Sequence, residues 1–227
     1  MTDDDHDHTL RAQAVAAVQR LDALGLNRGS TGNLSVRAGT AAGGGAGSFW
    51  ITPTGTPPED IAPDSFVLLD DAGTVLQGAW APSTEWPFHR AIYRARPDLH
   101  AVVHMHSPHA TALACLRRGL PPFHYMVAVA GGDSVPCTPY HLFGTDALSQ
   151  AVGAAFADRN ACLMANHGLV AAGATLAQAM KVAQEVEALC GIYLQTLAVG
   201  EPVLLSRQEM AAVIERFKSY GRARRAA

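Results

Sequence analysis

The sequence predicts an α/β layered fold whose mixed sheet includes hairpins. Strand-like apolar runs alternate with helical periods along the chain, a pattern typical of a sheet covered by helices. The chain has 227 residues, which is long enough to bury one substantial core. Because the sequence shows neither internal repeats nor low-complexity linkers, we expect one domain over residues 10–227, preceded by a disordered acidic tail over residues 1–9.

Each element of this fold has a local signal. Apolar stripes of helical period and N-capping residues predict the helices, at residues 10–24, 85–94, 110–116, 145–156, 175–197 and from 206 onwards. Short apolar or β-branched runs predict the strands, at residues 34–37, 49–52, 66–69, 75–76, 101–103 and 161–164. Gly25 is placed to end the first helix, and a turn over residues 71–73 to join the third and fourth strands as a hairpin.

Charge, hydropathy and cysteine usage exclude several classes of protein. The formal net charge of -3 and the pI of about 6.3 give no reason to expect nucleic acid or an anionic membrane as a partner. No apolar run reaches the roughly 20 residues that span a bilayer, and the acidic start of the chain differs from a secretory signal. The 4 cysteines are scattered without a C-x-x-C pair, so we expect free thiols and a cytoplasmic location.

The stretch around His104 carries the first chemical signal. Ala101 to Val103 form a strand-like run, and side chains two apart on a strand share a face, so His104 and His106 project together. Pro108 and a helix follow at once, which puts the pair at the carboxyl end of a strand, where α/β proteins commonly bind ligands. The pair offers a two-point grip on a divalent metal, although an isolated His-x-His is as readily a surface feature.

Two further residues could complete a metal site. His167 follows the apolar run at 161–164 and precedes a glycine, and Glu85 opens the helix predicted at 85–94. Three histidines and one glutamate form a suitable zinc sphere, in which the carboxylate can leave when a substrate arrives. The spacing alone does not establish that the four side chains meet.

Three loops offer hydroxyl groups and glycine N–H groups that suit an anion. They are Asn27 to Asn33, Pro53-Thr54-Gly55, and Ser83-Thr84 directly before Glu85. Ordinary turns and a helix cap are the alternatives for each loop alone. Neither a P-loop lysine nor the glycine spacing of a dinucleotide site is present, which argues against a nucleotide. Three such loops, one beside the candidate zinc carboxylate, suggest a phosphorylated substrate.

Taken in order, these stretches resemble the zinc-dependent class II aldolase and adducin-like family. The resemblance runs from about Leu10 to Tyr220 and rests on motifs that are specific jointly rather than singly. The motifs are Gly32-Asn-Leu-Ser-Val-Arg37, Thr52-Pro-Thr-Gly55, Ser83-Thr-Glu-Trp-Pro-Phe-His89, His104-Met-His106, His124-Tyr-Met126, Ala130-Gly-Gly132, Asn166-His-Gly-Leu169 and Phe217-Lys-Ser-Tyr-Gly221. The resemblance implies a three-layer α/β/α fold with a central mixed, largely antiparallel sheet, and a C4 homotetramer with active sites between subunits.

The resemblance also implies a role for each matching residue. The zinc ligands would be His104, His106 and His167, with Glu85 as a fourth ligand that becomes the catalytic base. The phosphate-binding residues would be Asn33, Thr54, Gly55, Ser83 and Thr84, with Gly32 beside them. A neighbouring subunit would supply Tyr125 as an acid–base group and Phe143 as an apolar wall. Tyr220 would lie in a C-terminal segment that closes over the site. Judged from the residues alone, a packed side chain is the more common outcome for a tyrosine such as Tyr125.

The implied reaction is a Zn²⁺-dependent cleavage of a ketose 1-phosphate, similar to L-fuculose 1-phosphate, to dihydroxyacetone phosphate and an aldehyde. Zinc would stabilise the enediolate as a Lewis acid, so no lysine Schiff base is required. Alternatives on the same fold are cleavage of 5-deoxy- or 5-methylthio-ribulose 1-phosphate, and a sugar-phosphate decarboxylase, dehydratase or 4-epimerase. Glu85 stands where the epimerases carry aspartate, which favours an aldolase. A non-catalytic adducin-like protein is disfavoured, because all three histidines and Glu85 are present.

Overall fold

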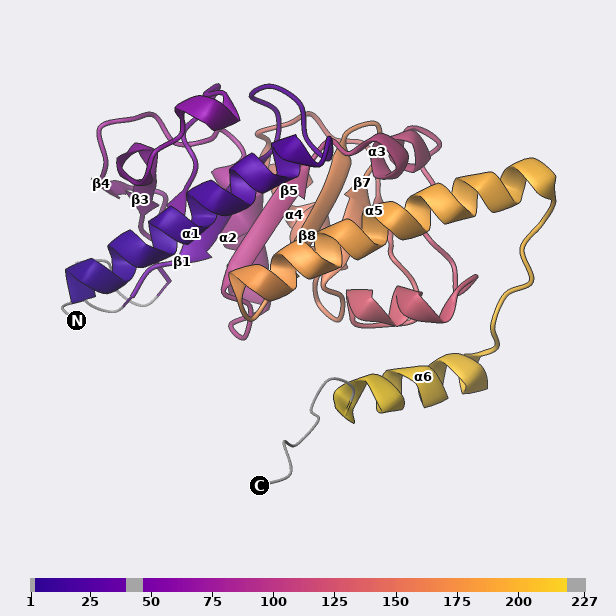
Figure 1. Cartoon of the computed structure of the whole chain (residues 1–227). Helices are drawn as coiled ribbons and strands as arrows, with labels where there is room; N and C mark the ends of the chain where they lie inside the picture. Colours follow the sequence, from indigo (N-terminus) through magenta and orange to yellow (C-terminus); the bar gives the residue numbers. More distant parts are fainter. Residues whose placement is uncertain (1–2, 40–46, 220–227) are drawn as a thin grey trace.

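The structure is a computed structural model, and it describes residues 3–39 and 47–219. At its centre lies an 8-stranded sheet with the strand order β4-β3-β2-β1-β5-β8-β7-β6 (Figure 1). The strands are β1 Asn33–Arg37, β2 Phe49–Ile51, β3 Val67–Leu69, β4 Val75–Gln77, β5 Ala101–Met105, β6 Cys137–Thr138, β7 Ala161–Met164 and β8 Gly168–Gly173. Neighbouring strands pair antiparallel except β6 and β7, which are parallel. The predicted mixed, largely antiparallel sheet is confirmed.

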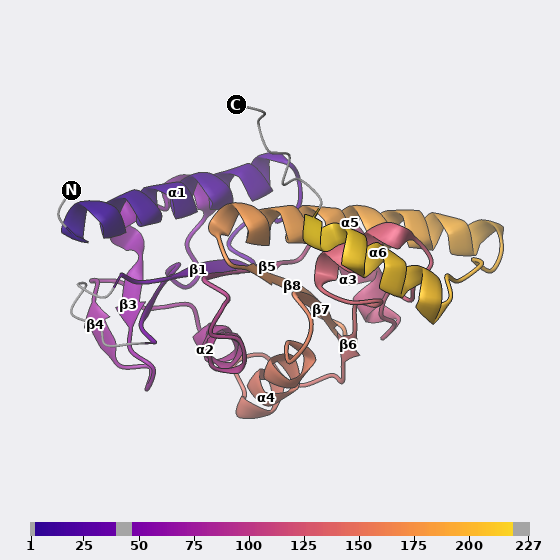
Figure 2. The ribbon, with the colours of Figure 1, turned by 90° about the horizontal axis from the view of Figure 1, so that it is seen from below.

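Helices cover both faces of this sheet and give the three predicted layers. The α-helices are α1 Asp3–Ala23, α2 Trp86–Ala95, α3 Pro108–Cys115, α4 Asp146–Ala155, α5 Leu176–Val199 and α6 Arg207–Ser219, and the 3₁₀ helices are η1 Pro58–Asp60, η2 Pro63–Ser65 and η3 Tyr125–Ala130. Figure 2 shows α1, α3, α5 and α6 on one side of the sheet and α2 and α4 on the other. Within the described ranges, the structure contains no helix with the length and apolar character that crossing a membrane requires.

Strand periodicity divides the core into one apolar cluster on each face of the sheet. On β5, Ala101, Val103 and Met105 belong to the cluster under α1, α3 and α5, whereas Val102 packs towards α2 and α4. Because side chains alternate along a strand, His104 faces the α2 side together with Val102. Burial of one large apolar side chain contributes roughly 1.5–3 kcal/mol, so the two clusters together fix the end of β5 that carries His104.

The first helix departs from the prediction. α1 begins at Asp3 rather than at Leu10, so residues 3–9, which we expected as a disordered tail, form its first turns. Asp7 is buried, and its Oδ1 accepts a hydrogen bond from the backbone N–H of Gly39 at 3.1 Å. Carboxylates near a helix N-terminus also interact favourably with the helix dipole. The acidic run therefore starts the helix instead of preceding it.

Capping residues set the start of three helices as predicted. Thr145 and Thr175 each accept, through the side chain, a hydrogen bond from a backbone N–H of the first turn, at 3.3 and 3.1 Å. Ser206 and Glu209 bond reciprocally, since each side chain accepts from the other residue's backbone N–H, at 3.2 and 2.7 Å. These caps satisfy backbone groups that a helix start leaves unpaired, so α4, α5 and α6 begin where the sequence indicated.

Candidate functional site

Three histidines meet at one end of the central strands of the sheet. His104 lies on β5, His106 follows directly after it, and His167 lies in the turn between β7 and β8. Nitrogens of the three rings all lie within 4.8 Å of one another, and the Nε2 atoms of His104 and His106 are 3.1 Å apart. The rings stand nearly edge to face, with interplanar angles of 68°, 79° and 81°. The fold thus brings together side chains whose convergence the spacing alone left open.

Strand register explains the convergence. β5 lies between β1 and β8, and His104 pairs across the sheet with Asn33 on one side and Val170 on the other. Because both pairings are antiparallel, the end of β5 adjoins the start of β1 and the start of β8. The turn before β8 carries His167, and the loop before β1 is the first of the predicted anion loops. The same end of the central strands therefore carries the three histidines and the first anion loop.

The neighbouring loops pack so closely against the end of β5 that glycine is required at two positions. A Cβ atom at Gly168 would lie 2.6 Å from the carbonyl oxygen of Met105 and 3.1 Å from Cδ2 of His106. Gly32 has a φ of +72°, and a Cβ atom there would lie 2.6 Å from the carbonyl oxygen of His104. A side chain at either position would displace the end of β5 that carries the histidines.

The surroundings of the histidines suit metal ligands. Nδ1 of His104 donates to the carbonyl oxygen of Leu169 at 2.9 Å, so Nε2 is the ring nitrogen that is left to face the other two rings. Burial lowers the pKa of His106 to about 4, and the neighbouring His104 and His167 act in the same direction. Neutral imidazole is the form that binds metal ions, so the ring environment suits a ligand role.

Glu85 completes the cluster from the start of α2. Its Oε1 lies 3.3 Å from Nε2 of His167, and its Oε2 lies 3.3 Å from Nε2 of His104. Burial alone raises the pKa of Glu85, but the combined effect of His104 and His167 is larger and brings it far below its usual range. Asn33 Nδ2 donates to Oε2 at 2.8 Å. Oε1 is buried and accepts no hydrogen bond from the described part of the chain.

This set of donor atoms fits a divalent transition metal. Imidazole nitrogens and a carboxylate oxygen are ligands that zinc prefers. A tetrahedral ion with bonds of about 2.0–2.1 Å separates neighbouring ligand atoms by roughly 3.3 Å, and the donor contacts here are 3.1 and 3.3 Å. A bound cation would also give Glu85 Oε1 the partner that a buried acceptor requires.

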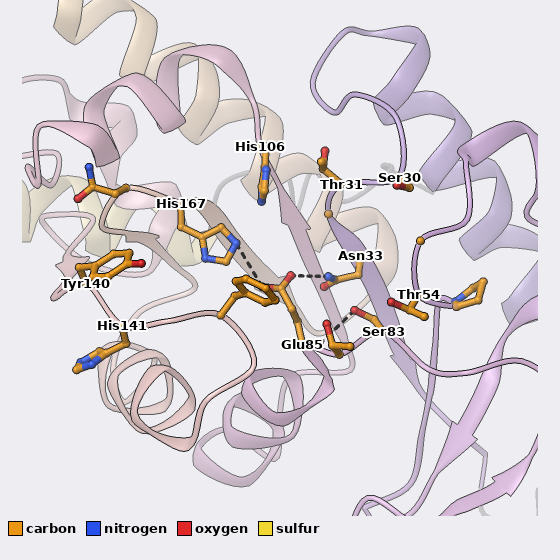
Figure 3. Close-up of a pocket in the computed structure, with 16 residues that line it drawn as sticks. Ser30, Thr31, Asn33, Thr54, Ser83, Glu85, His106, Tyr140, His141 and His167 are labelled. Carbon is orange, nitrogen blue, oxygen red and sulfur yellow. Dashed lines mark hydrogen bonds and ion pairs between the residues drawn. The ribbon is translucent and has the colours of Figure 1, made fainter.

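A pocket of about 380 Å³ opens over the cluster and has two unlike sides (Figure 3). Its lining residues are Ser30, Thr31, Gly32, Asn33, Pro53, Thr54, Gly55, Ser83, Thr84, Glu85, His106, Tyr140, His141, Phe143, Asn166 and His167. Figure 3 shows Thr31, Thr54 and Ser83 on one side of Glu85, and Tyr140 and His141 on the other. The hydroxyl groups and glycines thus lie opposite the rings of Tyr140 and His141, with the histidine cluster between the two sides.

The three predicted anion loops line the same pocket, and backbone hydrogen bonds tie the second loop to the third. The backbone N–H of Thr54 donates to the carbonyl oxygen of Ala81, and that of Ser83 to Thr52, both at 3.0 Å. The Ser83 hydroxyl accepts from the backbone N–H of Glu85 at 3.3 Å, and α2 has no side-chain cap. The Ser83 hydroxyl therefore bonds the N–H of the residue directly before α2, and the Glu85 side chain does not cap the helix.

Most of the predicted site residues line this pocket, and the exceptions are informative. His104 lies beneath it and is buried. Phe143 lines the pocket with 62% of its surface exposed, whereas Tyr125, 50% exposed on η3, is not among the lining residues. Tyr220 lies outside the described residues.

Several residues of the site escaped the sequence analysis. Tyr140 and His141 line the pocket, although no local motif set them apart, and Asn166, which stands in a quoted motif but was given no role, lines it too. His89 lies behind Glu85, and here a signal existed, because residues four apart on a predicted helix share a face. The sequence therefore predicted the histidine and loop side of the site better than its opposite wall.

Comparisons with known proteins agree with this fold and site. A three-layer fold with a histidine and carboxylate cluster at one end of the central strands is the architecture of a class II aldolase-like protein. The family model described as "Class II Aldolase and Adducin N-terminal domain" matches residues 12–194. The chain belongs to the class II aldolase and adducin family. The predicted family is confirmed.

Among its relatives are two kinds of sugar-phosphate aldolase. The chain is 46% identical over 212 residues to the 5-methylthioribulose-1-phosphate/5-deoxyribulose-1-phosphate aldolase of Rhodospirillum rubrum, covering 93% of this chain and 92% of that protein. It is 45% identical over 213 residues to the L-fuculose phosphate aldolase of Escherichia coli K12, covering 93% and 95%. A solved structure of an L-fuculose 1-phosphate aldolase has a TM-score of 0.87 at 36% identity, covering 92% of this chain and 96% of that one.

Proposed function

We propose that this chain is a class II, metal-dependent aldehyde-lyase that cleaves a ketose 1-phosphate to dihydroxyacetone phosphate and an aldehyde. One observation carries the proposal: a single pocket joins the histidine and carboxylate cluster to three loops rich in hydroxyl and N–H groups. The cluster suits a metal that polarises a carbonyl, and the loops suit a phosphate. The names of relatives at 45% and 46% identity, all sugar-phosphate aldolases, support the same reaction.

The metal in this proposal is Zn²⁺, held by His104, His106 and His167 with Glu85 as a fourth ligand in the resting site. The ion, when bound, supplies Lewis-acid stabilisation of the negative charge that develops on the substrate oxygens as the C–C bond breaks. The chain's own part is to orient the rings, as the His104–Leu169 hydrogen bond does, and to favour the neutral form of His106, as burial does by lowering its pKa.

Glu85 moves the proton at the carbon beside the substrate carbonyl. Its two oxygens differ, because Asn33 donates to Oε2 at 2.8 Å while Oε1 accepts no hydrogen bond from the described residues. Oε1 is therefore the oxygen that is free to take up and return the proton.

The three anion loops hold the phosphate away from the reacting bond. The phosphate-binding residues in this proposal are Gly32, Asn33, Thr54, Gly55, Ser83 and Thr84, all of which line the pocket. The start of α2, beside Ser83 and Thr84, adds the positive end of a helix dipole. Binding energy from this remote group fixes the carbon skeleton over the histidine cluster.

In our proposal, a neighbouring copy completes the site within a cytoplasmic C4 homotetramer. Tyr125 and Phe143 are 50% and 62% exposed, and large exposed rings of this kind favour a surface that another subunit covers. In that assembly Tyr125 of one subunit serves the hydroxyl or aldehyde oxygen in the site of its neighbour, Phe143 forms an apolar wall, and Tyr220 closes over the bound substrate.

A second candidate substrate is 5-deoxyribulose or 5-methylthioribulose 1-phosphate. The relative from Rhodospirillum rubrum, at 46% identity, favours it. The metal and phosphate halves of the pocket serve every ketose 1-phosphate alike. Discrimination between the candidate substrates therefore depends on the opposite side of the pocket, formed by Tyr140, His141 and Asn166, where the aldehyde part would lie.

A coupled assay for dihydroxyacetone phosphate tests the proposal. The substrates are L-fuculose 1-phosphate, 5-deoxyribulose 1-phosphate and 5-methylthioribulose 1-phosphate, each with and without a chelator. We expect release that the chelator abolishes and added Zn²⁺ restores, and the ranking of kcat/KM identifies the substrate. Absence of release from all three with zinc present would contradict the proposal and point to a decarboxylase, dehydratase or epimerase. Release that persists in the chelator would contradict the metal's role.

A further inference from the structure

A chain of buried polar side chains runs from the interior of the protein to Glu85. The Tyr93 hydroxyl lies 2.8 Å from Ser35 Oγ, which lies 2.7 Å from His89 Nδ1. His89 Nε2 lies 2.5 Å from Asn33 Oδ1, and Asn33 Nδ2 lies 2.8 Å from Glu85 Oε2. We call these five residues the polar chain. Tyr93, Ser35 and His89 do not line the substrate pocket.

Two periodicities build the polar chain. Asn33 and Ser35 are two apart on β1 and share a face, while Glu85, His89 and Tyr93 are four apart along α2 and share a stripe. Ser35 and His89 are 0% exposed. Burial of such groups is unfavourable unless each is hydrogen-bonded, so the polar chain is stable only while every member keeps its partner.

The direction of each hydrogen bond in the polar chain is fixed. The Glu85 carboxylate only accepts, so Asn33 Nδ2 donates to it and Asn33 Oδ1 is left as an acceptor. His89 Nε2 must then carry the hydrogen, and Nδ1 of the neutral ring accepts from the Ser35 hydroxyl. The neutral form is expected, because burial lowers the pKa of His89 to about 3. Ser35 Oγ in turn accepts from Tyr93.

We propose that His89 is a positioning residue that orients Glu85 through Asn33. By donating to Oδ1, His89 holds the Asn33 amide with Nδ2 towards Oε2, so that Glu85 presents Oε1 to the reacting centre. A half-turn of the amide would place Oδ1 against the carboxylate and Nδ2 against the His89 N–H. Two attractive contacts would become repulsive. The inference rests on the proposed function for its kinetic consequences, whereas the tautomer of His89 does not depend on the reaction.

The tautomer can be tested without any assay of turnover. Long-range ¹H–¹⁵N correlation spectra of the zinc-loaded full chain, with His89→Gln to assign the ring, should show a hydrogen on Nε2 and none on Nδ1. A hydrogen on Nδ1, or on both nitrogens at neutral pH, would overturn the proposal. A wild-type protein that cleaves no ketose phosphate but shows the Nε2–H tautomer would contradict the proposed function and leave the positioning of Glu85 supported.

A double-mutant cycle tests whether His89 acts through Asn33. His89→Phe fills the ring volume and removes both hydrogen bonds, and we expect full zinc content with kcat about 10- to 100-fold lower, the range typical of groups that orient metal-site ligands. In an Asn33→Ala background, the same change should lower kcat by less than about threefold, because contacts in one network are not additive. Equal losses in the two backgrounds would overturn the proposal.

Two more variants separate positioning from packing. His89→Gln retains an N–H donor for Asn33 Oδ1 and should recover most of the activity that His89→Phe loses. If His89→Phe does not fold, His89→Leu, which also lacks a donor, takes its place in the cycle. Ile92→Ala, in the apolar cluster under α2, lowers stability and removes none of the hydrogen bonds of the polar chain. It should keep kcat near wild type. A loss of kcat equal to that of His89→Phe would mean that general packing, not orientation, sets the rate.

Discussion

Two buried glutamates stand near the same end of β5, and their surroundings differ. Glu187 on α5 is 4% exposed. It accepts hydrogen bonds from Ser107 Oγ at 2.6 Å, His109 N and Nδ1 at 2.9 Å, and Ala110 N at 2.8 Å. Glu85 is 8% exposed, and its Oε2 accepts a hydrogen bond from Asn33. Its Oε1 lies beside Nε2 of His167 but accepts no hydrogen bond from the described residues.

The difference separates a structural carboxylate from a reactive one. Burial of a carboxylate is unfavourable unless hydrogen bonds or charges compensate it. Glu187 is compensated at both oxygens, and it ties α5 to the first turn of α3 just after His106. At Glu85 only Oε2 accepts a hydrogen bond from the described residues, and the neighbouring imidazoles supply the remaining compensation, so Oε1 keeps an open position for a cation or a proton. Of the two, we therefore expect only Glu85 to take part in the chemistry.

The largest expected effect is that of Glu85→Gln. The amide keeps the shape of the side chain but cannot accept a proton, and general-base catalysis typically contributes a factor of about 10²–10⁴. We expect kcat to fall by about that factor while the three histidines retain zinc. The measurement is kcat at saturating substrate together with zinc per chain. Near-normal turnover with zinc bound would exclude Glu85 as the base and remove the contrast with Glu187.

A smaller effect is expected on the loop side of the pocket. The Thr54 hydroxyl has no hydrogen bond within the described ranges and lines the pocket, so it is free to bind phosphate. Hydrogen bonds to charged groups contribute about 1.5–3 kcal/mol, so Thr54→Val should raise KM about 10-fold or more and leave kcat nearly unchanged. Thr196→Val, which removes a hydroxyl bonded locally to Ile192 on α5, is the control. A fall in kcat at constant KM would place Thr54 in the chemical step instead.

Local patterns explain how much of this site was predictable. Alternation on β5 gave the shared face of His104 and His106, and the small polar loops gave the anion side. The pairing of His104 with Asn33 depends on strand register between segments far apart in sequence, which no local pattern encodes. The polar chain has the same origin, because it needs α2 to pack over β1.

The parts that the sequence missed are those whose residues have no distinctive local pattern. β8 reads Gly-Leu-Val-Ala-Ala-Gly, and its small residues are neither alternating nor strongly β-branched, although the strand is fully buried. The acidic start of α1 has a composition typical of tails, and only its contact with Gly39 distinguishes it. The wall of Tyr140 and His141 follows the short strand β6 in a segment without helix or strand signals.

The smallest effect on turnover is expected from Glu187→Gln, the same substitution at the other glutamate. The amide keeps one acceptor oxygen but turns an NH₂ group towards the N–H donors at the start of α3, so we expect a loss of stability of about 1–3 kcal/mol. Because those contacts brace the loop after His106 without reaching the pocket, kcat at saturating zinc should stay within a few-fold of wild type. Urea unfolding and steady-state kinetics measure the two quantities. Glu185→Gln, on the same helix and without such contacts among the described residues, should change stability by less than about 0.5 kcal/mol. If Glu187→Gln lowered kcat as far as Glu85→Gln, complete hydrogen bonding would not distinguish a structural glutamate from a catalytic one in this fold.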